Sequence, residues 1–251
     1  MRTNIIKLKM KQIYTLAKKN IKIYYMEPPV LIFGVLFPAF LFLAFYQGRS
    51  LSPQKFIPGL VAIIFFFGGS SVGPYITPWE TNTKTLERVL STPTSVMMLI
   101  LGDIMSGVLF GISLSILILI LGVVIFHITI QNIALTLLAI IVSAFCFASL
   151  GSLFSALPTD KPSNVMMISN LIRLPVIFIS GVFVPIGELP GVAQFLAPFS
   201  PVTYVTDLMR YLLGNAHYFS VIRNFISLII FSVVIFGLAL FFHKQTMLKR
   251  I

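Results

Sequence analysis

Six long apolar runs dominate this sequence and restrict the folds open to it. Each run is near or above the roughly 20 residues that an α-helix needs to cross a bilayer. Charged residues make up 10% of the 251 residues, where a soluble domain carries about 25%, so we expect an integral membrane protein. The runs predict an all-α membrane fold with six transmembrane helices, at Val30–Tyr46, Phe56–Thr77, Val96–Phe126, Ile133–Leu157, Val165–Val184 and Val221–Phe242.

The positive charges predict how the chain is oriented. The formal net charge is +11, and seven of the 18 Lys and Arg residues precede the first apolar run. This placement is typical of a membrane surface rather than of nucleic-acid binding. With the N-terminus inside, thirteen Lys and Arg residues fall in inner segments and four in outer ones. We therefore expect a multi-pass protein of the plasma (inner) membrane with both termini in the cytoplasm.

Residues 1–29 precede the six-span bundle of residues 30–243 and have the pattern of an amphipathic helix that lies along the lipid headgroups. Pro28 and Pro29 end this helix and turn the chain into the bilayer. A merely solvated basic tail is the alternative interpretation. The apolar face carries Ile6, Met10, Ile13, Ala17 and Tyr24, and the basic face carries Lys7, Lys11, Lys18 and Lys22.

The segment Ser180–Gly214 follows the fifth run but cannot cross the bilayer itself. Prolines divide it into pieces too short to span, and these pieces are too apolar to lie in open water. Non-helical backbone at membrane depth is tolerated only where protein or a water-filled cavity covers it. We expect residues 185–214 to form a broken, re-entrant outer segment, a feature of chains that move something across a membrane. The prolines are Pro185, Pro190, Pro198 and Pro201.

The inner loop at residues 78–95 reads PWETNTKTLERVLSTPTS and has the pattern of a short charged helix. Acidic and basic residues recur at helical spacing, as in Glu80 and Lys84. Thr81 or Thr83 is expected to cap this helix, and Pro93 to stop it. Such a helix suits docking to another protein, but on pattern alone an ordinary loop helix that binds nothing is the likelier alternative. The apolar residues of the loop are Leu86, Val89 and Leu90.

Two charged residues, Asp103 and Arg173, fall within predicted spans. Charges at such depth are costly and usually face a bundle interior or a cavity. Their predicted depths allow an Asp103–Arg173 pair near the inner side. Such charges serve either in a substrate path or in fixing helix packing, and the sequence leaves both functions open.

Two further patterns favour packing over chemistry. Gly69-Ser70-Ser71-Val72-Gly73 matches a nucleophile elbow, but that motif needs a strand–turn–helix context, and here it lies in a span. Small residues there, with Gly107 and Gly111, are expected to let helices approach closely. Met97–Met98 and Met166–Met167 are interpreted as gap fillers rather than as the lining of a promiscuous site. The three His residues show no metal-ligand spacing.

Taken together, these features resemble the ABC-2 type permeases, the membrane subunits of one class of ABC exporters. The loop is similar to the family's coupling segment, and Ser180–Gly214 is similar to its segment between the fifth and sixth spans. The matching loop residues are Thr85, Leu86, Glu87, Arg88, Leu90, Thr92 and Pro93. In the later segment they are Ser180, Gly181, Pro185, Leu189, Pro190, Pro201, Tyr204, Asp207, Arg210 and Gly214. Asp103 is not part of that pattern.

The resemblance implies a single permease domain over residues 1–251 that works with a separate cytosolic ABC ATPase and a second permease copy in a homodimer or heterodimer. ATP and Mg²⁺ would bind the ATPase, because this chain has no G-x-x-x-x-G-K-[ST]. No catalytic residue and no metal site are expected here. The coupling residues would be Glu80, Lys84, Leu86, Glu87, Arg88, Val89, Leu90 and Pro93, with Leu86, Val89 and Leu90 entering a groove on the ATPase. The outer gate residues would be Pro185, Pro190, Pro201, Tyr204, Asp207 and Arg210.

Two other classes of function fit the spans. An intramembrane lipid-modifying enzyme would need convergent His or carboxylate residues at one depth, and the sequence offers only Asp103. A membrane scaffold without transport activity would have no need of a coupling segment. The sequence does not identify a substrate, and the export direction is implied by the resemblance alone.

Overall fold

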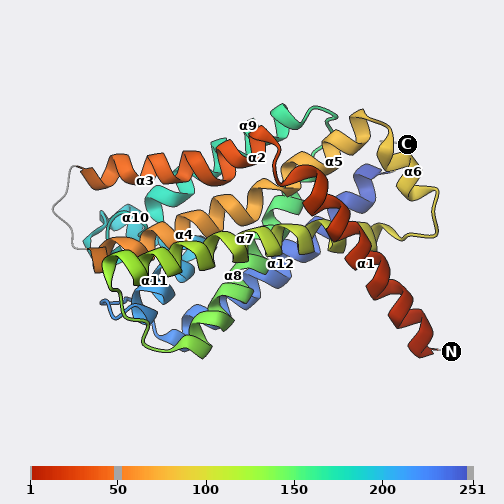
Figure 1. Ribbon diagram of the computed structural model, residues 1–251. Coiled ribbons are helices and arrows are strands. Elements are labelled where there is room, and N and C mark those ends of the chain that lie inside the picture. Colours follow the sequence, from red (N-terminus) through yellow and green to blue (C-terminus); the bar gives the residue numbers. More distant parts are fainter. Residues whose placement is uncertain (1, 48–52, 248–251) are drawn as a thin grey trace.

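The computed structural model describes residues 2–47 and 53–247, and the described residues form helices joined by turns and loops (Figure 1). The side chains of residues 2–6, 46 and 53 lie outside this description, Ile6 of the predicted apolar face among them. The α-helices are α1 (Arg2–Tyr24), α2 (Pro28–Leu31), α3 (Phe37–Gln47), α4 (Pro53–Ser71), α5 (Gly73–Asn82), α6 (Thr85–Leu90), α7 (Val96–Phe126), α8 (Ile133–Ser155), α9 (Pro162–Ile179), α10 (Gly191–Leu196), α11 (Pro201–Leu212) and α12 (Val221–Met247). A π-helical turn, η1 (Ile32–Leu36), and two 3₁₀ turns, η2 (Ile186–Glu188) and η3 (Ala197–Phe199), complete them.

The predicted six-span all-α fold is confirmed. Within the described residues, six helical stretches are long and apolar enough to cross a membrane. The helix α1 and the short α6 lie at one end of the bundle, and α10 and α11 lie at the other (Figure 1). We call these the α6 end and the α11 end. The stretches are Pro28–Phe45, Gln54–Asn82, Val96–Phe126, Ile133–Ser155, Pro162–Ile179 and Val221–Met247.

The second span, formed by α4 and α5, is the centre of the bundle. In its most apolar window 94% of the residues are buried, compared with 22% for the first and the last span. Its neighbours are α7, α8 and α11 around α4, and α8 and α9 around α5. Three consecutive phenylalanines, Phe65, Phe66 and Phe67, are all buried in this core. The outer spans therefore present most of their apolar side chains outward, where a bilayer would cover them.

Small residues set the spacing of the central helices, as predicted. A Cβ atom on Gly107 of α7 would lie 2.9 Å from the carbonyl oxygen of Gly69 on α4 and 3.0 Å from the Cβ of Ala148 on α8. Only glycine fits there without moving a backbone. The Ser70 hydroxyl, central to the nucleophile-elbow pattern, is buried and donates to the carbonyl of Phe66. The interpretation of this motif as packing therefore agrees with the structure.

Three predicted span ends are wrong. The sixth span continues past Phe242 to Met247. The second span runs on through Pro78 to Asn82, because α5 packs along α8 and α9 instead of entering a solvated loop. The fifth span ends at Ile179 rather than at Val184, because Gly181 turns the chain with a φ of 73°. The caps of α6 also differ from the prediction. Its N-cap is Lys84, in a left-handed conformation, and neither threonine provides a side-chain cap.

Candidate functional site

At the α6 end, α1 is tied to α5 and α7 through buried polar groups. Lys19 of α1 forms an ion pair with Glu80 of α5. The Tyr24 hydroxyl donates to the same carboxylate at 3.2 Å. Glu80 is only 1% exposed, so its negative charge is balanced inside the protein rather than displayed to a partner. Sequence analysis paired Glu80 with Lys84, but in the structure Lys84 is exposed and Lys19 is the partner.

Asp103 of α7 belongs to the same polar cluster. The side-chain amide of Asn20 donates to its Oδ1 at 2.7 Å, and the Thr77 hydroxyl donates to its Oδ2 at 3.5 Å. Asn20 is fully buried and lies on the face of α1 that also carries Ala17 and Tyr24. We define the α1 cluster as Lys19, Asn20, Tyr24, Thr77, Glu80 and Asp103. It fixes α1 on the bundle, in addition to any contact of the exposed basic face with headgroups.

Sequence analysis missed Lys19 and Asn20. The signal was present, since Asn20 lies three residues after Ala17 and four before Tyr24, on the predicted apolar face. A polar residue there calls for a buried partner. The identity of that partner was not readable from the sequence, because Asp103 is 83 positions away.

The short helix α6 packs on its own chain through one side. Leu86 is 1% exposed and packs in a cluster with Leu99 and Met247. Val89 and Leu90 are half-buried against the same cluster. The side chain of Leu86 is therefore not free to enter a groove on another protein while this packing persists. Among the predicted coupling residues, those with exposed side chains are Lys84, Glu87, Arg88 and Pro93.

A groove of about 470 Å³ separates α6 from α1. Lys11, Gln12 and Thr15 line it from α1, while Arg88 and Val89 line it from α6. The Gln12 side-chain amide donates to the carbonyl of Pro93 at 3.3 Å, which bridges the two sides. Arg88 belongs to both the groove and the exposed side of α6, and the charged residues that line the groove, Lys11 and Arg88, are both basic.

A larger cavity of about 650 Å³ lies between the first, second and fifth spans. Phe33 of η1, Tyr75 of α5 and Met166 and Met167 of α9 line it, and Asn170 adds one amide group. This size is within the range of small-molecule sites, which combine apolar walls with few polar groups. Both methionines of this pair thus lie at a cavity, the interpretation that sequence analysis did not favour.

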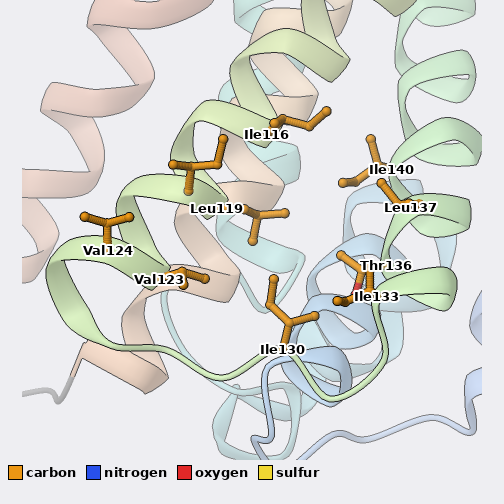
Figure 2. Close-up of a pocket in the computed structure, with 10 residues that line it drawn as sticks. Ile116, Leu119, Val123, Val124, Ile130, Ile133, Thr136, Leu137 and Ile140 are labelled. Atoms are coloured by element: carbon orange, nitrogen blue, oxygen red, sulfur yellow. The ribbon is translucent and has the colours of Figure 1, made fainter.

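A smaller cavity of about 270 Å³ lies between α7 and α8 towards the α11 end (Figure 2). Its lining is hydrocarbon apart from Thr136, whose hydroxyl donates to the carbonyl of Asn132. Leu137 and Val124 at its edge are largely exposed. It offers no group that would orient a polar ligand, so it suits lipid chains better than a specific substrate.

At the α11 end, α11 connects the end of the fifth span to the start of the sixth. Arg210 donates to the carbonyl of Gly181 at 2.7 Å. Asp207 accepts from the backbone N–H groups of Tyr218 at 2.6 Å and Phe219 at 2.9 Å, and from the Asn224 amide at 2.9 Å. Both charged residues are buried.

The other predicted residues of this segment have local functions. The Tyr204 hydroxyl donates to the carbonyl of Pro198 at 2.9 Å. Pro201 is the first residue of α11, and Ser200 caps that helix by accepting from the N–H of Val202. Pro185 precedes η2 and Pro190 precedes α10. The prolines therefore begin short helical pieces, which is the position where a missing N–H costs least.

Asp103 and Arg173 do not form the ion pair that their depth suggested. Asp103 bonds to Asn20 and Thr77, whereas Arg173 donates to the carbonyl of Ser70 and, at 3.3 Å, to Asn170. Both side chains are buried among helices. Their contacts are those of packing residues. On α9, Arg173 directly precedes Leu174, which lines the cavity.

Comparison with known proteins identifies the family. The family model described as ABC-2 type transporter matches residues 11–214, which is most of the chain. Over 197 residues the chain is 25% identical to the probable multidrug ABC transporter permease YbhS of Escherichia coli K12, covering 77% of this chain and 52% of that protein. It is 28% identical over 110 residues to nodulation protein J of Rhizobium leguminosarum bv. trifolii, covering 44% of this chain and 42% of that protein.

The chain thus spans about half the length of the YbhS relative. The region matched by the family model includes α6, the cavity and all of α11. The six apolar spans agree with a multi-pass membrane transporter. The chain therefore belongs to the ABC-2 type transporter family, as a membrane component of an ABC transporter.

Proposed function

We propose that this chain is the permease subunit of an ABC exporter of the plasma (inner) membrane. A separate cytosolic ATPase subunit would bind ATP and Mg²⁺ and dock at the α6 end. A second permease copy would complete the transport path, and membrane lipid would cover the remaining apolar surface. The α10–α11 segment would re-enter the membrane from the outer face and gate the exit.

The observation that carries this proposal is the position of α5. Tyr75 of this helix lines the 650 Å³ cavity, and the helix ends at Asn82, beside α6. The Thr85 hydroxyl of α6 donates to the carbonyl of Glu80 at 3.3 Å. A displacement of α6 by another subunit would therefore move α5, and with it the cavity residue Tyr75.

The docking surface on this proposal is the exposed side of α6 together with the groove beside α1. Lys84, Glu87 and Arg88 supply charges that a partner can pair with. Val89 contributes apolar surface at the groove. Leu86 instead anchors α6 to its own bundle, and Glu80 anchors α5 to α1. On this proposal Leu86 and Glu80 do not contact the ATPase, but they couple a movement of α6 or α5 to the rest of the bundle.

The cavity favours drug-sized, largely apolar compounds as the substrate class. Its walls are mostly hydrocarbon, and methionine side chains adapt to ligands of different shape. The polar side chains that line the cavity are those of Asn170, Ser163 and Tyr75. The Tyr75 hydroxyl also donates to Glu27 at 3.1 Å. A relative of the chain carries the description of a probable multidrug permease, which agrees with this substrate class.

The test is efflux of a lipophilic fluorescent dye from vesicles that contain this chain with its ATPase. Met167→Trp would fill the cavity and is expected to abolish ATP-dependent efflux while the ATPase still binds. Ile141→Trp is the matched control, because Ile141 is 54% exposed on α8, away from this cavity. Efflux at the wild-type rate by Met167→Trp would show that this cavity is not the path.

A further inference from the structure

The second span is interrupted near the middle of the bundle. Helix α4 ends at Ser71 and α5 begins at Gly73. In a continuous α-helix the N–H of residue 74 would donate to the carbonyl of residue 70. Residue 74 is a proline, which has no N–H. The carbonyl of Ser70 therefore lacks its helical donor inside an apolar bundle, where an unpaired backbone group is costly.

Arg173 of the fifth span supplies the missing donor. Its Nη2 donates to the Ser70 carbonyl, and its guanidinium lies 5.7 Å from the ring centre of Phe67 and 5.4 Å from that of Phe154. Arg173 is 1% exposed, and within the described residues no acidic side chain pairs with it. Its charge is thus held by a carbonyl, an amide and two ring faces.

The surrounding packing leaves the Ser70 carbonyl few other partners. A Cβ atom on Gly151 of α8 would lie 2.8 Å from that oxygen, so α8 covers it closely. A similar replacement occurs earlier in the span, where Pro58 has no N–H to donate to the carbonyl of Gln54. There the side-chain amide of Asn215 donates to that carbonyl at 2.8 Å. Side chains from other elements thus replace two hydrogen bonds that prolines remove.

We propose that Ser70–Pro74 is the hinge of the second span, and that Arg173 is the positioning residue that holds it in the observed conformation. On the N-terminal side of the hinge, α4 packs among α7, α8 and α11. On the C-terminal side of the hinge, α5 carries the cavity residue Tyr75 and leads to α6. Release of the Ser70 carbonyl by Arg173 would let α5 change its angle to α4. This inference concerns the conformation of the chain and does not depend on the substrate or on the ATPase.

The test measures the angle between α4 and α5 in the full chain, reconstituted in lipid nanodiscs. Spin labels go on Lys55→Cys of α4 and Asn82→Cys of α5, both exposed, in a Cys146→Ser background. Double electron–electron resonance spectroscopy then gives the distribution of distances between the two spin labels. Arg173→Met keeps the length of the side chain but removes the donor, and a second distance population is expected.

Pro74→Ala provides the decisive control, because it restores an N–H that can donate to Ser70. The double variant Pro74→Ala/Arg173→Met should regain the single population, and should regain a monodisperse elution profile if Arg173→Met alone aggregates. Arg223→Met is the matched control, since Arg223 lies 4.2 Å from the Phe219 ring and is exposed. An unchanged distribution in Arg173→Met, or no recovery in the double variant, would overturn the proposal.

Discussion

Asp207 shows how much one buried carboxylate can organise. Its three donors come from the loop before α12 and from the first turn of that helix. An ionised carboxylate only accepts hydrogen bonds, and all of these partners donate. Asp207→Asn would place an NH₂ group against at least one N–H donor. We expect a loss of about 1–3 kcal/mol in the free energy of unfolding, the cost of leaving a buried polar group unpaired.

Thermal unfolding of the detergent-purified protein would measure this loss for Asp207→Asn. Asp160→Asn is the control, because Asp160 is exposed in the loop between α8 and α9. A lower unfolding temperature for the first variant alone is the expected result. Equal unfolding temperatures for wild type and both variants would mean that Asp207 does not hold the start of α12.

At this scale the sequence identified residues better than it identified their partners. Asp207 and Arg210 were singled out by family resemblance, yet Arg210 donates to a carbonyl 29 positions away. Helical spacing relates residues three or four positions apart, so it carries no information about such contacts. The Lys19–Glu80 pair, 61 positions apart, was missed for the same reason.

At the scale of elements, the sequence predicts a helix well where its signals are local. Helix α7 begins and ends at the predicted residues, and Ser95 caps it by accepting from the N–H of Met98. The second span was predicted to end at Thr77, with Pro78 as the first residue of an inner loop, but α5 continues to Asn82. Tertiary packing and the neutralisation of Glu80 by Lys19 keep that stretch helical instead, and neither is visible in a local pattern.

The two sides of α6 should respond differently to mutation. Arg88→Glu changes an exposed charge, so it should weaken capture of the ATPase subunit in a pull-down without lowering the unfolding temperature. Leu86→Ala removes a buried side chain, so it should also destabilise the protein, by about 2–5 kcal/mol. Lys161→Glu is the control, as an exposed charge reversal outside α6. Equal capture by Arg88→Glu and Lys161→Glu would exclude the exposed side of α6 from docking.

At the scale of the whole molecule, the charge bias predicts which end faces the cytoplasm. Helix α1 lies at the α6 end and α10 at the opposite end (Figure 1). Gly187 lies beside α10, because its carbonyl accepts a hydrogen bond from the Gln194 side-chain amide at 3.2 Å. In a Cys146→Ser background, a membrane-impermeant thiol reagent outside whole cells should label Gly187→Cys but not Lys7→Cys. Permeabilised cells should show both labelled. Labelling of both positions in intact cells would contradict the proposed orientation.

The large cavity also bears on assembly, because its wall on α9 is open. Met167 and Leu171 line the cavity, yet they are 67% and 73% exposed. Four residues apart, they form one apolar stripe on the helix. In a single chain this stripe would face lipid, and in the proposed dimer a second copy would cover it. A path enclosed by protein requires the second arrangement, because lipid on one side would let substrate leave sideways.

Disulfide cross-linking in native membranes distinguishes these two arrangements. In the Cys146→Ser background, Leu171→Cys is expected to give a covalent dimer on mild oxidation, since a two-fold axis beside α9 would bring both copies of residue 171 close. Ile141→Cys, similarly apolar and exposed on α8, controls for random collisions between chains. Equal yields from the two variants, or none from Leu171→Cys and from Met167→Cys, would show that α9 faces lipid and that a second copy meets the chain elsewhere.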